Sequence, residues 1–145
     1  MSARENIAKN IIAQLENMQS PAPGKVSRVF FDVTKLAITQ FPAILVVTSN
    51  ETRQDISTDL REATIEYQLR CYVRGTQVDT LRNELVENIE ETLEVSRDRD
   101  IDLSTTNIHD VTTHITNIEV VDRELPLAEV IVTVQCTYRY AKGTL

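Results

Sequence analysis

The fold is decided by residues 61–74, REATIEYQLRCYVR, in which apolar and polar side chains alternate. One side of this stretch carries Ala63, Ile65, Tyr67, Leu69, Cys71 and Val73, and the other carries Glu62, Thr64, Glu66, Gln68, Arg70 and Tyr72. Successive side chains of a β-strand point to opposite faces, so the pattern predicts a strand with one buried and one polar face. Its length, well above the usual ~5–6 residues, favours a central position in an antiparallel sheet whose polar face meets water or another protein.

Two amphipathic helices and four further strands are predicted around this central strand. The helices are expected at about residues 2–18 and 76–95, where apolar residues recur at helical spacing. The other strands are expected at residues 26–33, 41–48, from 111 onward and at 128–140, with a bulge near Asn117. The order α-β-β-β-α-β-β predicts an α+β two-layer sandwich, a mainly antiparallel sheet of four to five strands with both helices packed on one face. Ile44 to Val47 is apolar on both faces, so that part of its strand should be covered twice.

Length, charge and cysteine content restrict the class of protein. The 145 residues fit a single domain, 1–145, and the net charge of −7 argues against binding to nucleic acid or to anionic membranes. No apolar run approaches the ~20 residues needed to span a bilayer, and the first ten residues lack a signal-peptide pattern, so we expect a soluble cytoplasmic product. Cys71 and Cys136 are expected as buried thiols of a reducing compartment, with a disulfide as the minor alternative.

The segment 49–60, SNETRQDISTDL, is polar and longer than the ~2–5 residues of an ordinary hairpin connection. We interpret it as an extended loop, an arm that touches a neighbouring subunit through Ile56 and Leu60. Arginine outnumbers lysine eleven to four, and its planar guanidinium suits ion pairs in interfaces. The candidate interface residues are Arg53, Asp55, Ile56, Leu60, Arg61, Arg70, Arg74, Arg97 and Arg99, with simple surface solubility as the alternative for the arginines.

Motifs for catalysis, cofactors or metals are not found. The three glycines are isolated, so no phosphate-binding loop can be built from them. The sequence also lacks a nucleophile elbow and a paired-cysteine metal motif. His109, Asp110 and His114 are the best metal candidates, but histidines five apart in a strand lie on opposite faces, which favours ordinary surface histidines. We therefore expect neither enzymatic activity nor a cofactor.

The layout of the chain is similar to that of the tail-terminator (tail-completion) proteins of long-tailed bacteriophages. The resemblance rests on the N-terminal helix, the opening Phe41-Pro42-Ala43 of a strand, the polar segment, the long alternating strand, the acidic helix and the aromatic-rich Thr137-Tyr138-Arg139-Tyr140. It implies a virion protein, assembled in the host cytoplasm, that forms a ring, usually of six copies, at the head–tail junction. Such a ring caps the tail tube, ends its polymerisation and offers a surface for head joining. The implied partners are the tail-tube protein, the neck or head-completion protein and, in a contractile tail, the sheath protein.

A channel that lets DNA pass without binding it should be acidic, because negative charge repels phosphates. Our hypothesis is that Glu84, Glu87, Glu91 and Glu94 line the lumen or rim of the ring, with a solvated helix face as the alternative. Other functions remain open at this stage: another neck, head-completion or tail-tube protein, a small cytoplasmic ligand-binding or regulatory domain, or an enzyme with dispersed acidic and histidine residues.

Overall fold

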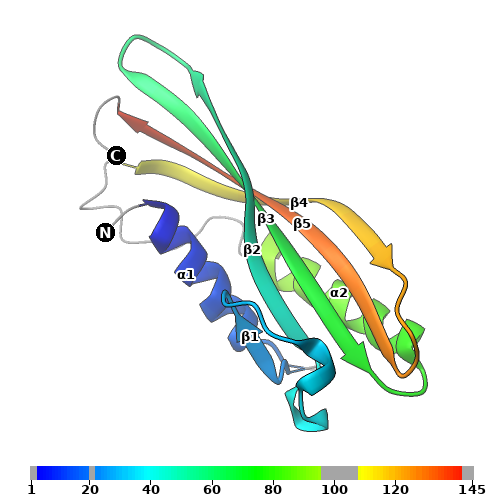
Figure 1. Cartoon of the computed structure of the whole chain (residues 1–145). Coiled ribbons are helices and arrows are strands. Elements are labelled where there is room, and N and C mark those ends of the chain that lie inside the picture. Colours follow the sequence, from blue (N-terminus) through cyan, green and yellow to red (C-terminus); the bar gives the residue numbers. More distant parts are fainter. Residues whose placement is uncertain (1–2, 20–21, 96–107, 142–145) are drawn as a thin grey trace.

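The structure, a computed structural model, describes residues 3–19, 22–95 and 108–141 (Figure 1). These residues form two helices and a five-stranded sheet: α1 (Ala3–Glu16), β1 (Lys25–Ser27), β2 (Ala43–Asp55), β3 (Leu60–Arg74), α2 (Val78–Val95), β4 (Ile108–Val121) and β5 (Leu127–Ala141). The strands lie in the order β1-β2-β3-β5-β4, with β1 parallel to β2 and all other neighbours antiparallel. The predicted α+β class, element order and central position of β3 are confirmed.

Both helices pack on the same face of the sheet, as predicted. The alternating apolar residues of β3 are buried there, and so are the inward residues of β5. Leu69 of β3, for example, lies between Val46 and Val132 in the register. The apolar side chains of α1 and α2 that face the sheet complete this core and are fully buried: Ile7, Ile11, Leu15, Leu85, Ile89 and Leu93. Burial of one such side chain contributes about 1.5–3 kcal/mol, so this face supplies most of the drive to fold.

A second, smaller core covers part of the opposite face. Val33, Ala43, Leu45 and Tyr72 form a buried cluster there. The predicted strand at 26–33 is wrong beyond Ser27: the chain leaves the sheet, crosses to this face and forms a 3₁₀ turn at Val33–Lys35. Phe31 and Val33 therefore pack onto a sheet to which they do not belong. The predicted double coverage of residues 44–47 is confirmed, since Ile44 and Val46 face the helices while Leu45 faces this second core.

The predicted long loop at 49–60 is also wrong, because β2 continues to Asp55 and only residues 56–59 connect it to β3. Main-chain pairing with β3 runs to the end of the strand, interrupted once by a bulge between Thr48 and Asn50. The side chains of residues 48–55 are exposed or half-buried on both faces, so no apolar alternation marks the strand. We call residues 49–62 the hairpin arm; its tip projects beyond both helices (Figure 1).

The β4–β5 pair contains the predicted bulge, a register shift between Ile115 and Asn117. Cys71 lies opposite Val130, whereas Cys136 lies opposite Ile65, so the two thiols are offset by six positions along β3. Both cysteines are free and buried. Within the described ranges, neither helix has the length and apolar character that crossing a bilayer requires.

Candidate assembly surfaces

The hairpin arm brings together five of the residues singled out in the sequence. Arg61 contacts Asp55 at 2.9 Å, and Arg53 contacts Glu51 at 3.4 Å. The turn is closed by hydrogen bonds from the amides of Ile56 and Ser57 to the carbonyl oxygen of Leu60, over 3.0 and 3.2 Å. Ile56 is 44% exposed at the tip. The arm is therefore a charge-paired ribbon that presents one apolar side chain at its end.

The remaining candidate arginines are scattered. Arg70 lies on the second face of the sheet, opposite Leu45 on β2 and opposite Ile131 on β5. Arg74 is exposed at the other end of β3, where it borders a hollow of about 160 Å³ with Ile38. Arg97 and Arg99 lie outside the described residues. The predicted arginine set thus does not form one surface.

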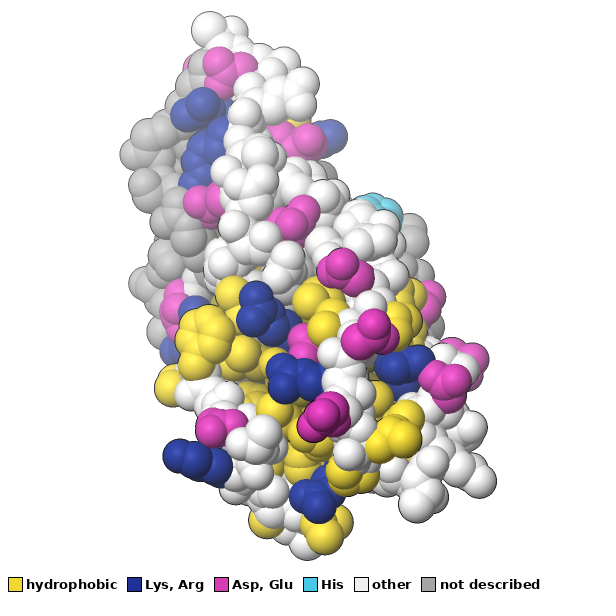
Figure 2. Space-filling model, turned by 45° about the vertical axis from the view of Figure 1, so that its right-hand side comes forward, with side chains coloured by type: hydrophobic (Ala, Val, Ile, Leu, Met, Phe, Trp, Pro, Cys, Tyr) yellow, Lys and Arg dark blue, Asp and Glu magenta, His cyan; other side chains and the backbone are white. Residues whose placement is uncertain are grey.

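The polar face of β3 is tied to its neighbouring strands. Glu66 accepts hydrogen bonds from Ser49 at 3.1 Å and from Gln135 at 3.5 Å. The hydroxyls of Thr64 and Thr137 are 3.2 Å apart, so they share a hydrogen bond. Figure 2 shows the contrast along the molecule: hydrophobic side chains gather at the end opposite the arm, among both signs of charge, while the arm end has almost none.

A buried carboxylate holds the turn between β4 and β5 against the second face. Arg123 Nε donates to Glu129 Oε1 over 2.8 Å, and Glu129 is 5% exposed. The Arg123 guanidinium also lies 5.4 Å from the centre of the Tyr72 ring, a cation–π contact. Burial raises the pKa of the Tyr72 hydroxyl, and the Glu129 carboxylate raises it further. In the alternation of β5, Glu129 faces away from the helices, and nothing in that pattern indicates that the position is covered.

The acidic face of α2 exists as a continuous surface. Glu84, Glu87 and Glu91 are exposed and line a shallow, open depression together with Gln19 and Asn88. Asn88 Nδ2 donates to the carbonyl oxygen of Gln19 over 2.8 Å, which joins α2 to the end of the α1 segment. Glu94 belongs to the last turn of α2, and its side chain lies outside the described residues.

Of the three metal candidates, His109, Asp110 and His114, the structure describes the side chain of His114 only. His114 is exposed and lies opposite Gln135. The side chains of His109 and Asp110 are outside the described residues. Among the described residues, no group of three or more His, Cys, Asp or Glu side chains is arranged to hold a metal ion.

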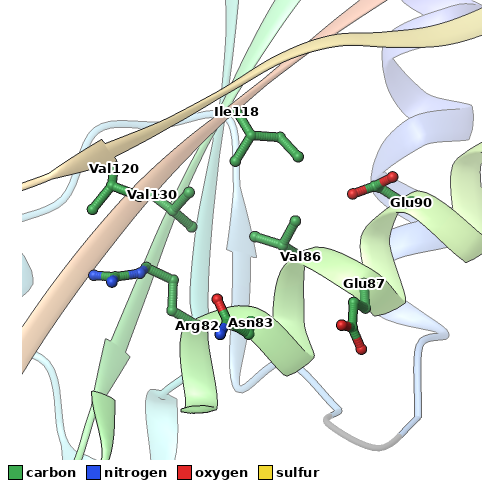
Figure 3. Close-up of a pocket in the computed structure, with 8 residues that line it drawn as sticks. All are labelled: Arg82, Asn83, Val86, Glu87, Glu90, Ile118, Val120 and Val130. Carbon is green, nitrogen blue, oxygen red and sulfur yellow. The ribbon is translucent and has the colours of Figure 1, made fainter. Parts of the chain in front are cut away.

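An apolar groove lies between α2 and β4, which is the edge strand of the sheet (Figure 3). We call it the α2–β4 groove; its volume is about 290 Å³, and it is lined by Arg82, Asn83, Val86, Glu87, Glu90, Ile118, Val120 and Val130. Val86 of α2 and Ile118 of β4 point toward one another across it (Figure 3). Ile118 is 41% and Val120 is 56% exposed, so both present apolar surface to solvent at this edge of the sheet.

A second apolar surface lies at the opposite edge of the sheet, directly after β1. Val29 and Phe30, here called the β1-edge pair, are 75% and 70% exposed. Ser27 Oγ fixes the bend that presents them, since it accepts a hydrogen bond from the Val29 amide at 3.0 Å and donates to the Val29 carbonyl at 2.9 Å. Arg28 donates to Glu5 over 2.6 Å, which lowers the pKa of that carboxyl.

Comparison with known proteins shows a shared fold. No protein-family model matches the sequence, and no curated protein does either. A chain from the solved structure of the virion of a native gene transfer agent particle is similar with a TM-score of 0.53 and 8% sequence identity. The likeness covers 95% of this chain and 95% of that chain. At this identity the likeness concerns the fold, over nearly the whole length of both proteins.

Proposed function

We propose that the chain is a structural protein of a phage-type virion, and that it forms a ring that caps the tail tube, ends its polymerisation and joins the tail to the head. The observation that carries the proposal is the pair of open edges on opposite sides of one sheet. Within the described residues, β4 pairs only with β5, and β2 beyond Leu45 pairs only with β3. A ring requires two different surfaces on each subunit, and open strand edges are surfaces on which another chain can assemble.

Two further features support this role. The similar chain belongs to a virion particle, and the likeness is not confined to a common substructure but covers 95% of each chain. The acidic face of Glu84, Glu87 and Glu91 is exposed rather than engaged in the core. Placed on the lumen or rim of a ring, it would repel the phosphates of passing DNA.

The hairpin arm is the part best suited to reach the tail tube or the neck. It extends beyond the helices, and its paired backbone keeps Ile56 at a defined distance from the core (Figure 1). Arg53, Asp55, Leu60 and Arg61 would then surround the contact. Ile56 would supply the apolar centre of that contact, and the charged side chains around it would form its polar border.

The test is the mass of the purified protein in solution, by light scattering, with and without the cognate tail-tube protein. A closed ring of about six copies, or a monomer that assembles only on tube ends, is expected. Long polymers formed by the protein alone would instead identify a tube subunit. A monomer or dimer that ignores tubes would overturn the proposal and favour a small ligand-binding domain.

A further inference from the structure

We propose that neighbouring subunits are joined by the β1-edge pair of one copy, which inserts into the α2–β4 groove of the next. This inference rests on the proposed function, because it assumes that copies of the chain associate side by side. The occupant of the groove is thus a second copy of this chain, represented by Val29 and Phe30. Three observations, on position, size and charge, lead to this assignment.

The first observation is position across the sheet. Val26 lies opposite Ile44, Ile44 opposite Cys71, Cys71 opposite Val130 and Val130 opposite Val120. Val26 and Val120 are therefore the two ends of one row that crosses all five strands. The β1-edge pair begins three residues after Val26, and Val120 lines the groove. A rotation about an axis along the strands would bring Val26 of one copy level with Val120 of the next, and so place the segment after β1 beside the groove.

The second observation is the match in size and apolar character. The groove has an apolar floor of Val86, Ile118, Val120 and Val130 (Figure 3). Its volume of about 290 Å³ is at the lower end of the ~300–1,000 Å³ of small-molecule sites, so it suits one or two side chains better than a cofactor. Val29 and Phe30 are among the most exposed large apolar side chains of the described residues, and insertion would remove their surface from water.

The third observation is charge. Glu87 and Glu90 border the groove, whereas Lys25 and Arg28 flank the β1-edge pair. Arg82 also borders the groove, but it is paired with Asp79 of its own helix. Likewise, Arg28 is paired with Glu5. The charge left over is negative at the groove, from Glu87 and Glu90, and positive at the β1 edge, from Lys25, whose Nζ lies 5.4 Å from the centre of the Phe31 ring of its own subunit. Complementary charges at the border of an apolar contact set its register and speed its formation more than they add affinity.

A contact of this kind is heterologous, since it joins two different surfaces of the subunit. Each copy uses its β1 edge toward one neighbour and its β4 edge toward the other. Repeating the contact generates a ring if the rotation closes. The arm and two residues of the acidic face, Glu84 and Glu91, lie outside the groove, so they remain available for the tube and the lumen.

The test is a double variant, Phe30→Cys with Val120→Cys, oxidised at high protein concentration and examined on a non-reducing gel. Cys71 and Cys136 are buried and do not compete. We expect a ladder of cross-linked multimers that ends at the mass of the closed ring. Each single variant should yield at most dimers, and the pair Phe30→Cys with Ile56→Cys, which joins the β1 edge to the arm tip, should not form a ladder. Absence of the ladder in the first double variant would overturn the inference.

A second measurement separates this inference from the ring itself. Phe30→Asp and Val120→Asp should each weaken association at least tenfold in sedimentation or light scattering, while Ile38→Asp, at a similarly exposed position, should not. If the unmodified protein associates but neither Phe30→Asp nor Val120→Asp weakens it and no ladder forms, the contact is wrong and the ring stands. If the protein stays monomeric with and without tubes and gives no ladder, both proposals fail.

Discussion

Arg123 Nε donates to Glu129 Oε1 over 2.8 Å, across the turn that joins β4 to β5. The two side chains differ sharply in exposure: that of Glu129 is 6% exposed and that of Arg123 is 35% exposed. The arginine therefore covers a carboxylate that is otherwise shut off from water. It connects the second core, through Tyr72, to the end of the edge strand that borders the α2–β4 groove.

Replacement of Arg123 by alanine should destabilise the protein by roughly 1–3 kcal/mol, because it leaves a buried carboxylate without its partner. Chemical denaturation followed by circular dichroism measures this loss. Arg139→Ala is the matched control: Arg139 pairs with Glu62 at 3.3 Å, but its partner carboxylate is 28% exposed rather than 6%, so it keeps contact with water. Such pairs contribute ~0–1 kcal/mol. Equal losses for the two variants would contradict the structural role of Glu129.

Gly24→Ala should also destabilise the protein, by roughly 1–3 kcal/mol, as overpacking usually does. A Cβ at this position would lie 2.5 Å from the backbone of Thr39 and of Gln40, and backbone cannot rotate away. Gly75→Ala is the control, because its Cβ would meet the end of the flexible Leu81 side chain at 2.8 Å. Thermal melts of both variants should show a clear decrease for the first and a small change for the second.

The protein should lose stability as the pH rises above about 8.5. Burial raises the pKa of the Cys71 thiol, with a further contribution from Glu129, and burial also raises the pKa of Tyr67. In the unfolded chain these groups ionise near their usual values of about 8.5 and about 10. Ionisation thus lowers the free energy of the unfolded state but not that of the folded state. The urea concentration at the midpoint of unfolding should therefore fall across this pH range.

The same burial predicts that Cys71 does not react with a thiol reagent in the native protein. A coloured disulfide reagent at pH 8 should modify it only in denaturant, because the thiolate is the reactive form. Rapid modification under native conditions would show that β3 opens locally near Cys71. The Cys71→Ser variant identifies which of the two cysteines carries the signal.

Ile56→Ser should leave folding unchanged, within about 0.5 kcal/mol, since the side chain is largely exposed. It should weaken association with the tail tube if the arm docks there. A stronger variant replaces residues 53–63 with an Asn-Gly turn between Thr52 and Thr64, which face each other in the ladder. A shortened protein that folds and still caps tubes would show that the arm has another task.

Lysine at positions 84 and 91 should not affect folding, because both side chains are exposed, and Glu87 is left unchanged because it borders the α2–β4 groove. If this face lines the lumen, assembled rings of the variant should retain linear double-stranded DNA in low salt, whereas unmodified rings do not. Lysine at Asp122 and Glu124, also exposed, gives the same net charge elsewhere and should retain less DNA. Equal retention by the two variants would argue against a luminal position.

The sequence was sufficient for the class and order of the fold because β3, β5 and the two helices each have one apolar side, and periodicity reports such one-sided burial directly. It failed for residues 28–33, where Val33 packs on the second face of the sheet yet repeats the alternation of a strand. It failed again for β2 beyond Thr48, since hydrogen bonds between main chains leave no trace in side-chain pattern.

The candidate surfaces could be predicted only in part from the sequence. Exposed glutamates at helical spacing were recognisable, and so was the polarity of the arm. The alignment of Val26 with Val120 was not, because it depends on four successive strand registers that are set by turns and packing. The burial of Glu129 could not be predicted either, since its position in β5 is an ordinary outward one.

The bulge between Thr48 and Asn50 has a mechanical consequence. β3 runs without a register shift from the turn of the arm to Arg74 against both β2 and β5, except at this bulge. A force applied at Ile56 is therefore carried along continuous strands into the sheet under the helices. Bulges bend and twist a ribbon more than regular pairing does, so the arm should behave as a stiff lever whose flexing is concentrated at Ser49.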